Sequence, residues 1–478
     1  MFILIPTLLP IFSSSLASEL IVAFYGIINL AWLICIALSA LFVARLFIER
    51  PKYESSSSIL SSDVSNLSHI VAILIYKEPI DLIEKSLESL RAQTQASKLI
   101  VVIGLEEKTP QLEWKQQVIQ HNFKDAFQQL IFTVHPYGLP NEIPGKCSNI
   151  NYAVRTAVQR LKSENLLNYE LTTVTSCDAD NLFHPKYFEY LSQEFLSTQR
   201  RNQVVWQSPL FYNWQLASSP FFTRVTSILR PVFMMGILIP FNINTMSVFS
   251  LSLDLYVRGG YTHPGYQMED IISAIRWMTE IKKRVEIKPL YIPTLSGPTS
   301  GHNILEEFHE WRRQARRWTI GAAEVFHYYC VRCGRIPMKT SVSWGLSFAA
   351  YYCIFLCTAP LVCSLGALMP VIYPETGAAL IWGSYNFSEI LKLMGLLQVA
   401  CLSAVFILNS FWLKLLRLNE HVPTWRNFLH FLTSPFVVIA YAFIELLALH
   451  EMAIAGKSVC THIPSKKEAL SGRQLKKA

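Results

Sequence analysis

The sequence predicts an α/β domain with a mixed, mostly parallel sheet, joined to α-helical transmembrane segments. Three observations predict this. Of 478 residues, 51% are hydrophobic and only 16% are charged, whereas soluble domains average about 25% charged residues. Apolar runs near both ends are long enough to cross a bilayer. Between them, short apolar runs alternate with helix-periodic segments, a pattern typical of parallel sheets covered by helices.

Residues 20–44 are the first predicted transmembrane helix. Arg45 and Arg50 follow it, and positive charge beside a span marks the cytoplasmic side, so the next part of the chain is expected in the cytosol. The apolar start, MFILIPTLLPIF, lacks the basic region of a signal peptide. We therefore expect an N-terminal segment over 1–48, with one transmembrane helix and a short interfacial stretch. A serine-rich polar linker is expected over 49–68.

A cytosolic α/β domain is expected over residues 69–335, ending in interfacial helices. Buried-strand runs occur at 69–76, 98–105, 129–136 and 170–180, and helix-periodic segments at 79–93 and 148–161. Strands that alternate with helices in this way form βαβ units, whose strands are parallel.

Apolar segments return over 336–455, and a basic tail follows over 456–478. The candidate spans are about 343–370, 391–413 and 429–450. The loop 374–389 contains no Lys or Arg and is expected outside, whereas the basic loop 414–427 is expected inside. Three crossings that start in the cytosol leave the tail outside, yet its charge favours the inside. Either one segment is re-entrant or doubled, with a helix broken at a proline such as Pro435, or the tail breaks the charge rule.

The chain carries a net charge of +8. Much of this charge lies beside the apolar segments, so we assign it to membrane topology and lipid headgroups. Membrane lipid is therefore an expected partner, and nucleic acid is not.

Asp178 and Asp180 lie at the carboxyl end of a predicted strand, where ligands bind in open α/β sheets. On an extended backbone the two side chains point to the same face. Two neighbouring carboxylates suit Mg²⁺, which proteins hold through one or two carboxylates plus substrate phosphates. A solvated Asp-rich turn explains the same residues equally well.

Other charged residues lie at predicted helix starts. Glu269 and Asp270 open a helix-periodic segment. The helix dipole favours carboxylates there, so capping suffices to explain them, and a general base is the functional alternative. Lys146, in PGKCSNIN, stands just before a helix whose N-terminus suits a phosphate. An ordinary glycine turn is the alternative there.

The stretch WRRQARRW at 311–318 concentrates cations and tryptophans. Gln314, Arg317 and Trp318 stand at i, i+3 and i+4, so on a helix they share one face. An amide, a fixed cation and a flat ring together suit a ligand that is both anionic and ring-shaped.

The motifs YKEP, GKCSNIN, DAD, QSP, MED and QARRW occur in this order and are followed by membrane spans. In this the chain resembles the membrane-embedded family 2 glycosyltransferases, the superfamily of cellulose, chitin and hyaluronan synthases. The resemblance covers residues 65–340 by motif and the flanking spans by architecture, and QARRW matches the family's most specific motif, Q-x-x-R-W. It implies that the α/β domain is a GT-A type nucleotide-sugar-binding domain.

The resemblance also implies roles for the site residues. Asp270 would be the catalytic base, and Asp180 would hold Mg²⁺ or Mn²⁺. The substrate-binding residues would be Glu78, Glu106, Lys146, Asp178, Glu269, Gln314, Arg317 and Trp318. The chain departs from the family at Lys77, where an Asn usually precedes the Glu, and at Glu106, where an Asp is usual.

The function implied is inverting transfer of a hexose from a nucleotide sugar, expected to be UDP-linked, to a glycan acceptor. The enzyme would be a multi-pass membrane protein with its catalytic domain facing the cytosol. Processive polysaccharide synthesis is one form of this activity, and transfer of a single sugar to a lipid or short acceptor is the alternative. A non-catalytic membrane scaffold is the alternative from another class, although a scaffold has no physical need for all of these charged residues.

Overall fold

A mixed seven-stranded sheet forms the centre of the α/β domain. The computed structural model describes residues 2–55, 67–212, 214, 216, 219–297, 303–381, 383–417 and 422–456. The sheet has the strand order β3-β2-β1-β4-β8-β6-β9. Its strands are β1 (Ser68–Ile75), β2 (Leu99–Glu106), β3 (Gln129–His135), β4 (Thr172–Asp178), β6 (Val204–Gln207), β8 (Phe249–Ser252) and β9 (Glu286–Pro289). Only β8 runs antiparallel to its neighbours, so the expected mixed, mostly parallel sheet is confirmed.

Helices of the α/β domain cover this sheet, and those over 80–91, 146–163 and 269–281 lie where helical periodicity was expected, whereas the other three were not predicted. The helices are α5 (Ile80–Arg91), α6 (Leu112–Phe123), α7 (Lys146–Ser163), α8 (Tyr187–Ser197), α10 (Leu253–Arg258) and α11 (Glu269–Ile281). The strands β1 and β2 are buried along nearly their whole length, as expected of parallel strands with helices on both faces. A second, small sheet has the order β5-β10-β7, with β5 (Asn181–Phe183), β10 (Thr294–Ser296) and β7 (Leu210–Phe211).

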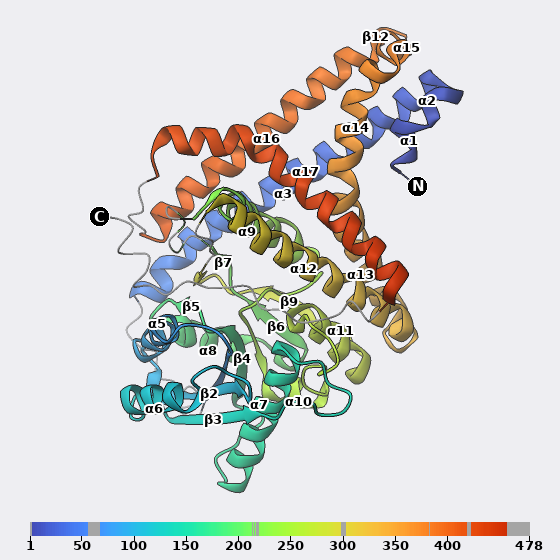
Figure 1. The fold of residues 1–478 in the computed structure, drawn as a ribbon. Helices are drawn as coiled ribbons and strands as arrows, with labels where there is room; N and C mark the ends of the chain where they lie inside the picture. The colour runs from blue at the N-terminus through green and yellow to red at the C-terminus, as the bar shows by residue number, and fades with distance from the viewer. Residues whose placement is uncertain are drawn as a thin grey trace.

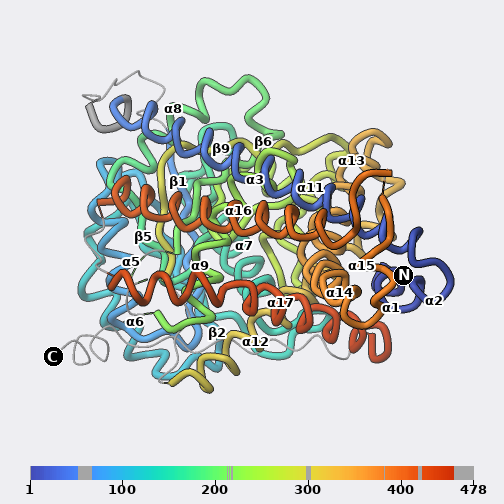
Figure 2. The backbone as a smooth tube through the Cα atoms, turned by 90° about the horizontal axis from the view of Figure 1, so that it is seen from above, coloured from blue at the N-terminus to red at the C-terminus, as the bar shows by residue number. Residues whose placement is uncertain are grey.

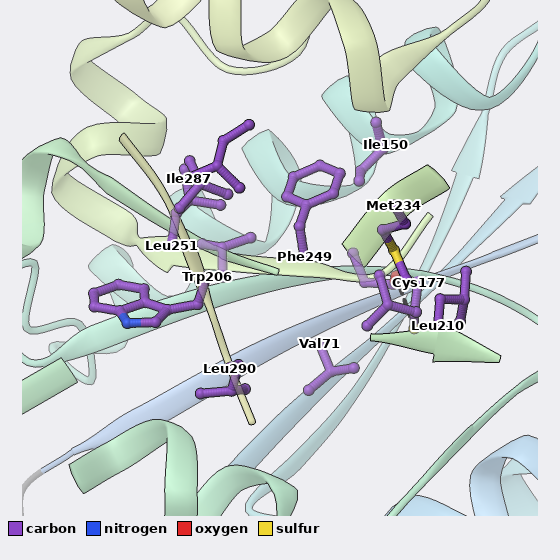
Figure 3. Packing of buried hydrophobic residues seen from close by; sticks show 14 of the residues in the cluster. Val71, Ile150, Cys177, Trp206, Leu210, Met234, Phe249, Leu251, Ile287 and Leu290 are labelled. Carbon is purple, nitrogen blue, oxygen red and sulfur yellow. Dashed lines mark hydrogen bonds between the residues drawn. The ribbon is translucent and has the colours of Figure 1, made fainter. Parts of the chain in front are cut away.

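The core between the sheet and its helices combines aliphatic side chains with large aromatic ones such as Trp206 and Phe249 (Figure 3). Trp206 on β6 and Phe249 on β8 are fully buried. The Trp206 ring lies 5.7 Å from the Phe195 ring on α8, and the Phe249 ring lies 6.1 Å from the Trp277 ring on α11. These contacts fix α8 and α11 against the sheet, and α11 carries two of the expected site residues.

Five helical segments of the described chain are long and apolar enough to cross a membrane. They are Ser14–Pro51 in α3 (Ser14–Ser55), Phe221–Leu238 in α9 (Phe221–Phe233) and η3 (Met234–Leu238), Met338–Ile372 in α13 (Met338–Ala349), η5 (Ala350–Thr358) and α14 (Ala359–Ile372), Phe387–Leu415 in α16, and Thr424–Ala455 in α17. Four of them contain the apolar runs expected from the sequence. Figure 1 shows the long helices above the α/β domain, and Figure 2 shows α3 and α16 side by side.

The fifth segment, Phe221–Leu238, was not among the predicted spans, and it contains Arg224 and Arg230. The strand β6 precedes it and β8 follows it, and these two strands pair directly with each other. Both strands therefore lie on one side of any membrane. The chain must enter and leave this segment on that same side, so it does not cross.

The ends of the bundle are marked by contacts between helices. At one end, the Arg50 guanidinium of α3 donates a hydrogen bond to the backbone oxygen of Leu415, the last residue of α16 (3.2 Å). At the other end, the Tyr373 hydroxyl donates to the backbone oxygen of Thr7 (2.7 Å). The short strands β11 (Leu380–Ile381) and β12 (Tyr385–Asn386) form a hairpin that joins α14 to α16.

Helix α17 behaves differently, because it packs on α12 (Ile304–Arg332) of the α/β domain (Figure 1). Near its start, Arg224 of α9 donates to Asn427 (2.8 Å). Near its end, Glu451 accepts two hydrogen bonds from Arg316 of α12, at 2.8 and 2.6 Å. Both ends of α17 therefore contact helices of the α/β domain.

Candidate active site

A polar cavity of about 180 Å³ lies at the carboxyl ends of β1, β2 and β4, the edge where ligands bind in open α/β sheets. All ten residues expected at the site line it. They are Glu78, Glu106, Lys146, Asp178, Asp180, Glu269, Asp270, Gln314, Arg317 and Trp318. These residues are spread over most of the α/β domain sequence, and the fold brings them to one place.

The sequence led us to expect both aspartates of DAD on one extended strand, and this expectation is wrong. Asp178 ends β4, and the chain turns at Ala179 and Asp180 before β5 begins. The turn is held by Asn181, whose side-chain oxygen accepts a hydrogen bond from the Asp178 backbone N–H (2.6 Å). Asp180 is buried with 1% exposure, whereas Asp178 is partly accessible. Both carboxylates still reach the same cavity, because the turn folds back over the sheet edge.

Lys146 is the central cation of the site. It is the first residue of α7, after Gly145, whose φ of +144° lies in the region that favours glycine. Its ammonium group lies 2.8 Å from the Asp178 carboxylate and also forms an ion pair with Glu269. Burial alone lowers the pKa of Lys146, but Asp178, Glu269 and Asp270 outweigh this effect and raise the pKa well above its usual range. Lys146 therefore joins the end of β4 to the start of α11 as a permanent cation.

Glu269 and Asp270 form the first turn of α11, as expected. Burial raises the pKa of Glu269 to about 8, against the lowering effect of Lys146. Burial also raises the pKa of Asp270, and Lys146 again opposes the rise. A carboxylate with a raised pKa accepts a proton more readily than a solvated one, which suits a general base.

Ser247 is a site residue that sequence reasoning missed. Its hydroxyl donates a hydrogen bond to Asp178, and its backbone N–H donates to Oδ2 of Asp270 (3.3 Å). Its φ of +44° is unusual for a residue with a side chain. Gln207, from QSP, holds this segment by accepting from the Met246 N–H (2.8 Å) and donating to the Val248 carbonyl (2.8 Å). No local pattern signals Ser247, because its partners are distant in sequence.

Glu78 and Glu106 lie at the ends of β1 and β2. Glu78 accepts a hydrogen bond from the Tyr76 backbone N–H (2.7 Å), and the buried Lys115 donates to the Glu78 backbone oxygen (2.9 Å). Burial raises the pKa of Glu106, with a further rise from Glu78 and a lowering effect from His135. The two carboxylates therefore add acidic charge to the cavity where β1 and β2 end.

The stretch 311–318 lies entirely on α12. Some of its side chains are buried in the core, and others line the cavity. Trp311 is buried with 1% exposure, and its indole N–H donates to the Thr226 hydroxyl (2.8 Å). Gln314, Arg317 and Trp318 line the cavity from one helix face, as the spacing predicted. Burial lowers the pKa of Arg317, while the nearby carboxylates Asp178, Glu269 and Asp270 oppose the shift. The two tryptophans of this motif thus occupy different environments.

Arg230 of α9 is a second residue that sequence reasoning missed. Its guanidinium lies 3.9 Å from the centre of the Trp318 ring and 4.3 Å from that of Tyr212, distances typical of cation–π contacts. A usable signal was present in the sequence, because an arginine inside an apolar segment is costly and tends to be functional.

The charges that line this cavity suit a divalent cation together with an anionic ligand. Six carboxyl groups and three cations line it, so a diphosphate without a countercation would meet an acidic wall. Gly297 lies against Asp180: a Cβ added there would come within 2.9 Å of the carboxylate, which keeps space open beside this group. No cluster of three His, Cys, Asp or Glu side chains placed to hold a metal ion occurs among the described residues. The remaining ligands of such a cation would therefore come from phosphate and water, as is common for Mg²⁺.

Comparisons with known proteins give remote structural likenesses. No protein-family model matches the chain, and no curated protein matches it in sequence. The mannosyltransferase PcManGT from Pyrobaculum calidifontis, solved with GDP-Man and Mn²⁺, is 16% identical over 80% of this chain and 99% of its own, with a TM-score of 0.45. TarS of S. aureus is 10% identical over 71% of this chain and 54% of its own (TM-score 0.33). Glucosyl-3-phosphoglycerate synthase of Mycobacterium tuberculosis, in complex with Mn²⁺, UDP and phosphoglyceric acid, is 14% identical over 53% of this chain and 77% of its own (TM-score 0.30).

At these TM-scores the likenesses say nothing of this chain's donor, acceptor or metal. The sheet itself confirms the fold class expected from the sequence, an α/β domain with a mixed, mostly parallel sheet combined with membrane-length helices.

Proposed function

We propose that this protein is a membrane-bound glycosyltransferase that transfers a sugar from a nucleotide sugar to an acceptor hydroxyl. One observation carries the proposal: ten residues chosen from the sequence for this chemistry line a single cavity at the ligand-binding edge of the sheet. The non-catalytic scaffold is disfavoured, because burying so many charges in one cavity is costly and stabilises nothing by itself.

The proposed reaction is a single displacement with inversion. Asp270 takes the proton of the acceptor hydroxyl as that oxygen forms a bond to the anomeric carbon of the donor sugar. The bond from this carbon to the nucleoside diphosphate breaks, and the electron pair leaves with the diphosphate. Oδ2 of Asp270 is held by Ser247, whereas Oδ1 has no hydrogen-bond partner among the described residues. This second oxygen is therefore the one offered to the acceptor.

The cations of the site have a separate role, which is to hold the diphosphate. Arg317 and Lys146 supply fixed positive charge, and Gln314 and Trp318 line the wall beside them. Mg²⁺ or Mn²⁺, held by Asp180 with Asp178 nearby, would neutralise charge that develops on the leaving group. UDP is the nucleotide we propose first, with Glu78 and Glu106 at the nucleotide end.

The α/β domain of residues 69–335 is proposed to face the cytosol between an N-terminal span and the C-terminal helices. In this arrangement three segments cross the membrane: α3, the segment from α13 to α14, and α16. Helix α17 lies on the side of the α/β domain, because its two ends contact α9 and α12 of that domain. Of the two alternatives left open by the sequence, this arrangement is the one in which a C-terminal segment, here α17, is re-entrant and does not cross the membrane. It places the end of α17 on the cytosolic side, where the basic tail satisfies the charge rule, although the tail itself lies outside the described residues.

The test is release of nucleoside diphosphate by the purified full-length protein, offered a panel of UDP- and GDP-linked sugars. We expect Asp270→Asn to lower turnover by about 10²–10⁴-fold while nucleotide affinity is retained. Asp254→Asn is the matched control, because Asp254 lies on α10 outside the cavity and pairs with Arg258, which is 57% exposed. Turnover by Asp270→Asn at the wild-type rate, or no turnover with any donor, would refute the proposal.

Metal removal gives an independent prediction. EDTA should abolish turnover, and Mg²⁺ or Mn²⁺ should restore it, because the acidic wall repels a diphosphate that lacks a countercation. Lithium or sodium at the same ionic strength is the control for screening. Full turnover in EDTA would exclude the metal role and leave the base assignment standing.

A further inference from the structure

A second and larger cavity, of about 700 Å³, lies inside the helical bundle. Its wall is formed by α3, α9, η5, α14, α16 and α17, and most of its lining side chains are apolar. Volumes of this size and character are typical of sites for small molecules.

The two cavities meet at the proposed catalytic base. Five residues line both: Arg230, Met246, Met268, Asp270 and Trp318. A molecule that fills the apolar cavity therefore presents one end to Asp270, beside the polar cavity in which the donor is proposed to bind.

The apolar cavity is elongated along the helices. On α16 its lining runs from Ser388 through Leu391, Gly395 and Gln398 to Leu402, a helical spacing that keeps one face inward. The fourteen helical steps from Ser388 to Leu402 extend about 21 Å, compared with about 30 Å for the hydrocarbon core of a bilayer. The cavity thus reaches deep into the bundle from the side of the α/β domain.

The polar groups in the middle of this cavity are already bonded within the protein. The Tyr25 hydroxyl donates to the Cys363 backbone oxygen, and the Ser364 hydroxyl donates to that of Pro360 (2.6 Å). The Gln398 amide donates to the Cys363 sulfur (3.9 Å). A glycan chain carries hydroxyls on every sugar, and burying them without partners is costly. Hydrocarbon carries no such cost.

The apolar cavity also reaches the outer surface between α16 and α17. Val399 is 52% exposed and Pro435 is exposed, and both line the cavity. The side chains beside them on the same helices, Leu396 and Phe436, are 68% and 70% exposed, as expected of surfaces that face lipid. A membrane lipid can therefore enter from the side without leaving the bilayer.

We infer that the acceptor is a membrane lipid, with its hydrocarbon in the cavity between α3, α14, α16 and α17 and a headgroup hydroxyl at Asp270. The inference rests on the proposed function and selects its substrate class. A hydroxyl is the acceptor group because its proton must be removed when it attacks, and a buried carboxylate with a raised pKa is suited to that step. The product is then a lipid glycoside, and the other product is the nucleoside diphosphate.

The experiment follows radiolabelled sugar from the donor in vesicles that contain the full-length protein. One set of vesicles is made from phosphatidylcholine plus the total lipid extract of the native membrane, and a second set from phosphatidylcholine with soluble oligosaccharides added. We expect label in the organic phase of the first set only, in a product that survives mild acid, as a glycoside of a hydroxyl does. Label in water-soluble or long-chain carbohydrate overturns the inference, and so does a lipid product cleaved by mild acid, which indicates a glycosyl phosphate. Absence of nucleotide release in every set contradicts the proposed function instead.

Two glycines provide matched variants for the cavity itself. A Cβ added at Gly395 meets no atom within 4 Å, and Gly395 lines the cavity. Gly26 on α3 also has open space around it but does not line the cavity. Gly395→Phe should lower transfer to lipid by about tenfold or more, because the ring fills volume that hydrocarbon needs, and Gly26→Phe should not. The Kd for nucleotide, measured on both variants, reports whether the polar cavity is intact. Equal transfer by Gly395→Phe and Gly26→Phe would contradict the placement of the lipid.

Discussion

At the scale of single residues, the site depends on one cation placed among carboxylates. Lys146 contacts Asp178 and Glu269, which come from different parts of the chain. A partly buried ion pair of this kind is costly to break from one side, because the remaining charges lose their partner. Lys146 therefore sets both the geometry of the acidic residues and the proton affinity of Asp270.

The first residue-scale prediction concerns pH. Burial holds the pKa of Asp270 above its usual 3.8, and Lys146 limits the rise. The base must be ionised to act, so turnover is lost as pH falls through this raised pKa. Lys146→Met removes the opposing charge, and we expect the acidic limb of the kcat profile to move to higher pH. Lys115→Met is the control, because Lys115 contacts Tyr76 and Glu78 instead. An acidic limb that stays in place or moves to lower pH would be inconsistent with Lys146 acting on Asp270.

The second residue-scale prediction compares the two tryptophans of 311–318. Trp311 is packed in the core, so Trp311→Ala should cost about 3–5 kcal/mol of stability and lower the folded yield. Trp318 lines both cavities, so Trp318→Ala should fold near normally and bind nucleotide while transfer to the acceptor is lost. Thermal unfolding, nucleotide affinity and transfer rate are measured on both variants. If the activity of Trp318→Ala falls only in step with its folded fraction, the tryptophan is structural.

At the scale of elements, α12 closes the site by lying very close to the start of α11. Gly321 of α12 faces Met268, the residue before Glu269 and Asp270, and a Cβ at this glycine would come within 2.1 Å of the Met268 side chain. The small residue therefore permits the approach that brings Gln314, Arg317 and Trp318 over the cavity. Packing at this contact limits how closely the motif on α12 approaches the proposed base.

The element-scale prediction tests this contact. Gly321→Ala should cost about 1–3 kcal/mol through overpacking, and it should lower transfer more than the loss of folded protein explains, because Met268 must move and Asp270 lies two residues away. Gly334→Ala is the matched control, since nothing lies within 4 Å of an added Cβ there. Thermal unfolding and transfer rate are compared for the two variants. Wild-type activity in Gly321→Ala would show that α12 tolerates displacement.

At the scale of the whole molecule, the arrangement of α17 decides the topology. A helix of this length and apolarity is normally assigned to a crossing, but residues near both of its ends, Asn427 and Glu451, contact helices of the α/β domain. In the proposed topology it rests on that side of the bundle, where it also contributes Pro435 and Val438 to the apolar cavity.

The whole-molecule prediction is one of sidedness. Single cysteines are introduced at Lys108, Ser384 and Ile454 in a variant whose Cys330, Cys333, Cys353 and Cys460 are replaced by serine, and sealed vesicles are labelled with an impermeant reagent. We expect Lys108→Cys and Ile454→Cys to react from one side and Ser384→Cys, in the loop between α14 and α16, from the other. Reaction of Ile454→Cys together with Ser384→Cys would mean that α17 crosses the membrane.

Much of the fold followed from local patterns in the sequence. The strand runs at 69–76, 98–105 and 129–136 agree with β1, β2 and β3 within one residue at each end, because a buried parallel strand must be apolar along its length. The helix start at Glu269 was also marked locally, by a pair of acids, whereas α7 begins at Lys146, two residues before the expected start at 148. The ten site residues were identified through motif resemblance, and their convergence on one cavity follows from the parallel sheet, whose strand ends share an edge.

The sequence by itself determined the class of the fold, the membrane-length helices and most of the charged residues of the candidate site, since each depends on periodicity, length or a contiguous motif. Only the tertiary structure decided that Ser247 and Arg230 line the candidate cavity, that α9 returns to the side it came from, and that α17 rests on α12. It also decided that an apolar cavity reaches Asp270. These features depend on contacts between segments far apart in the chain. Such contacts cannot be read from local composition, because they depend on how the side chains of distant segments fit together and not on the spacing of apolar residues within one segment.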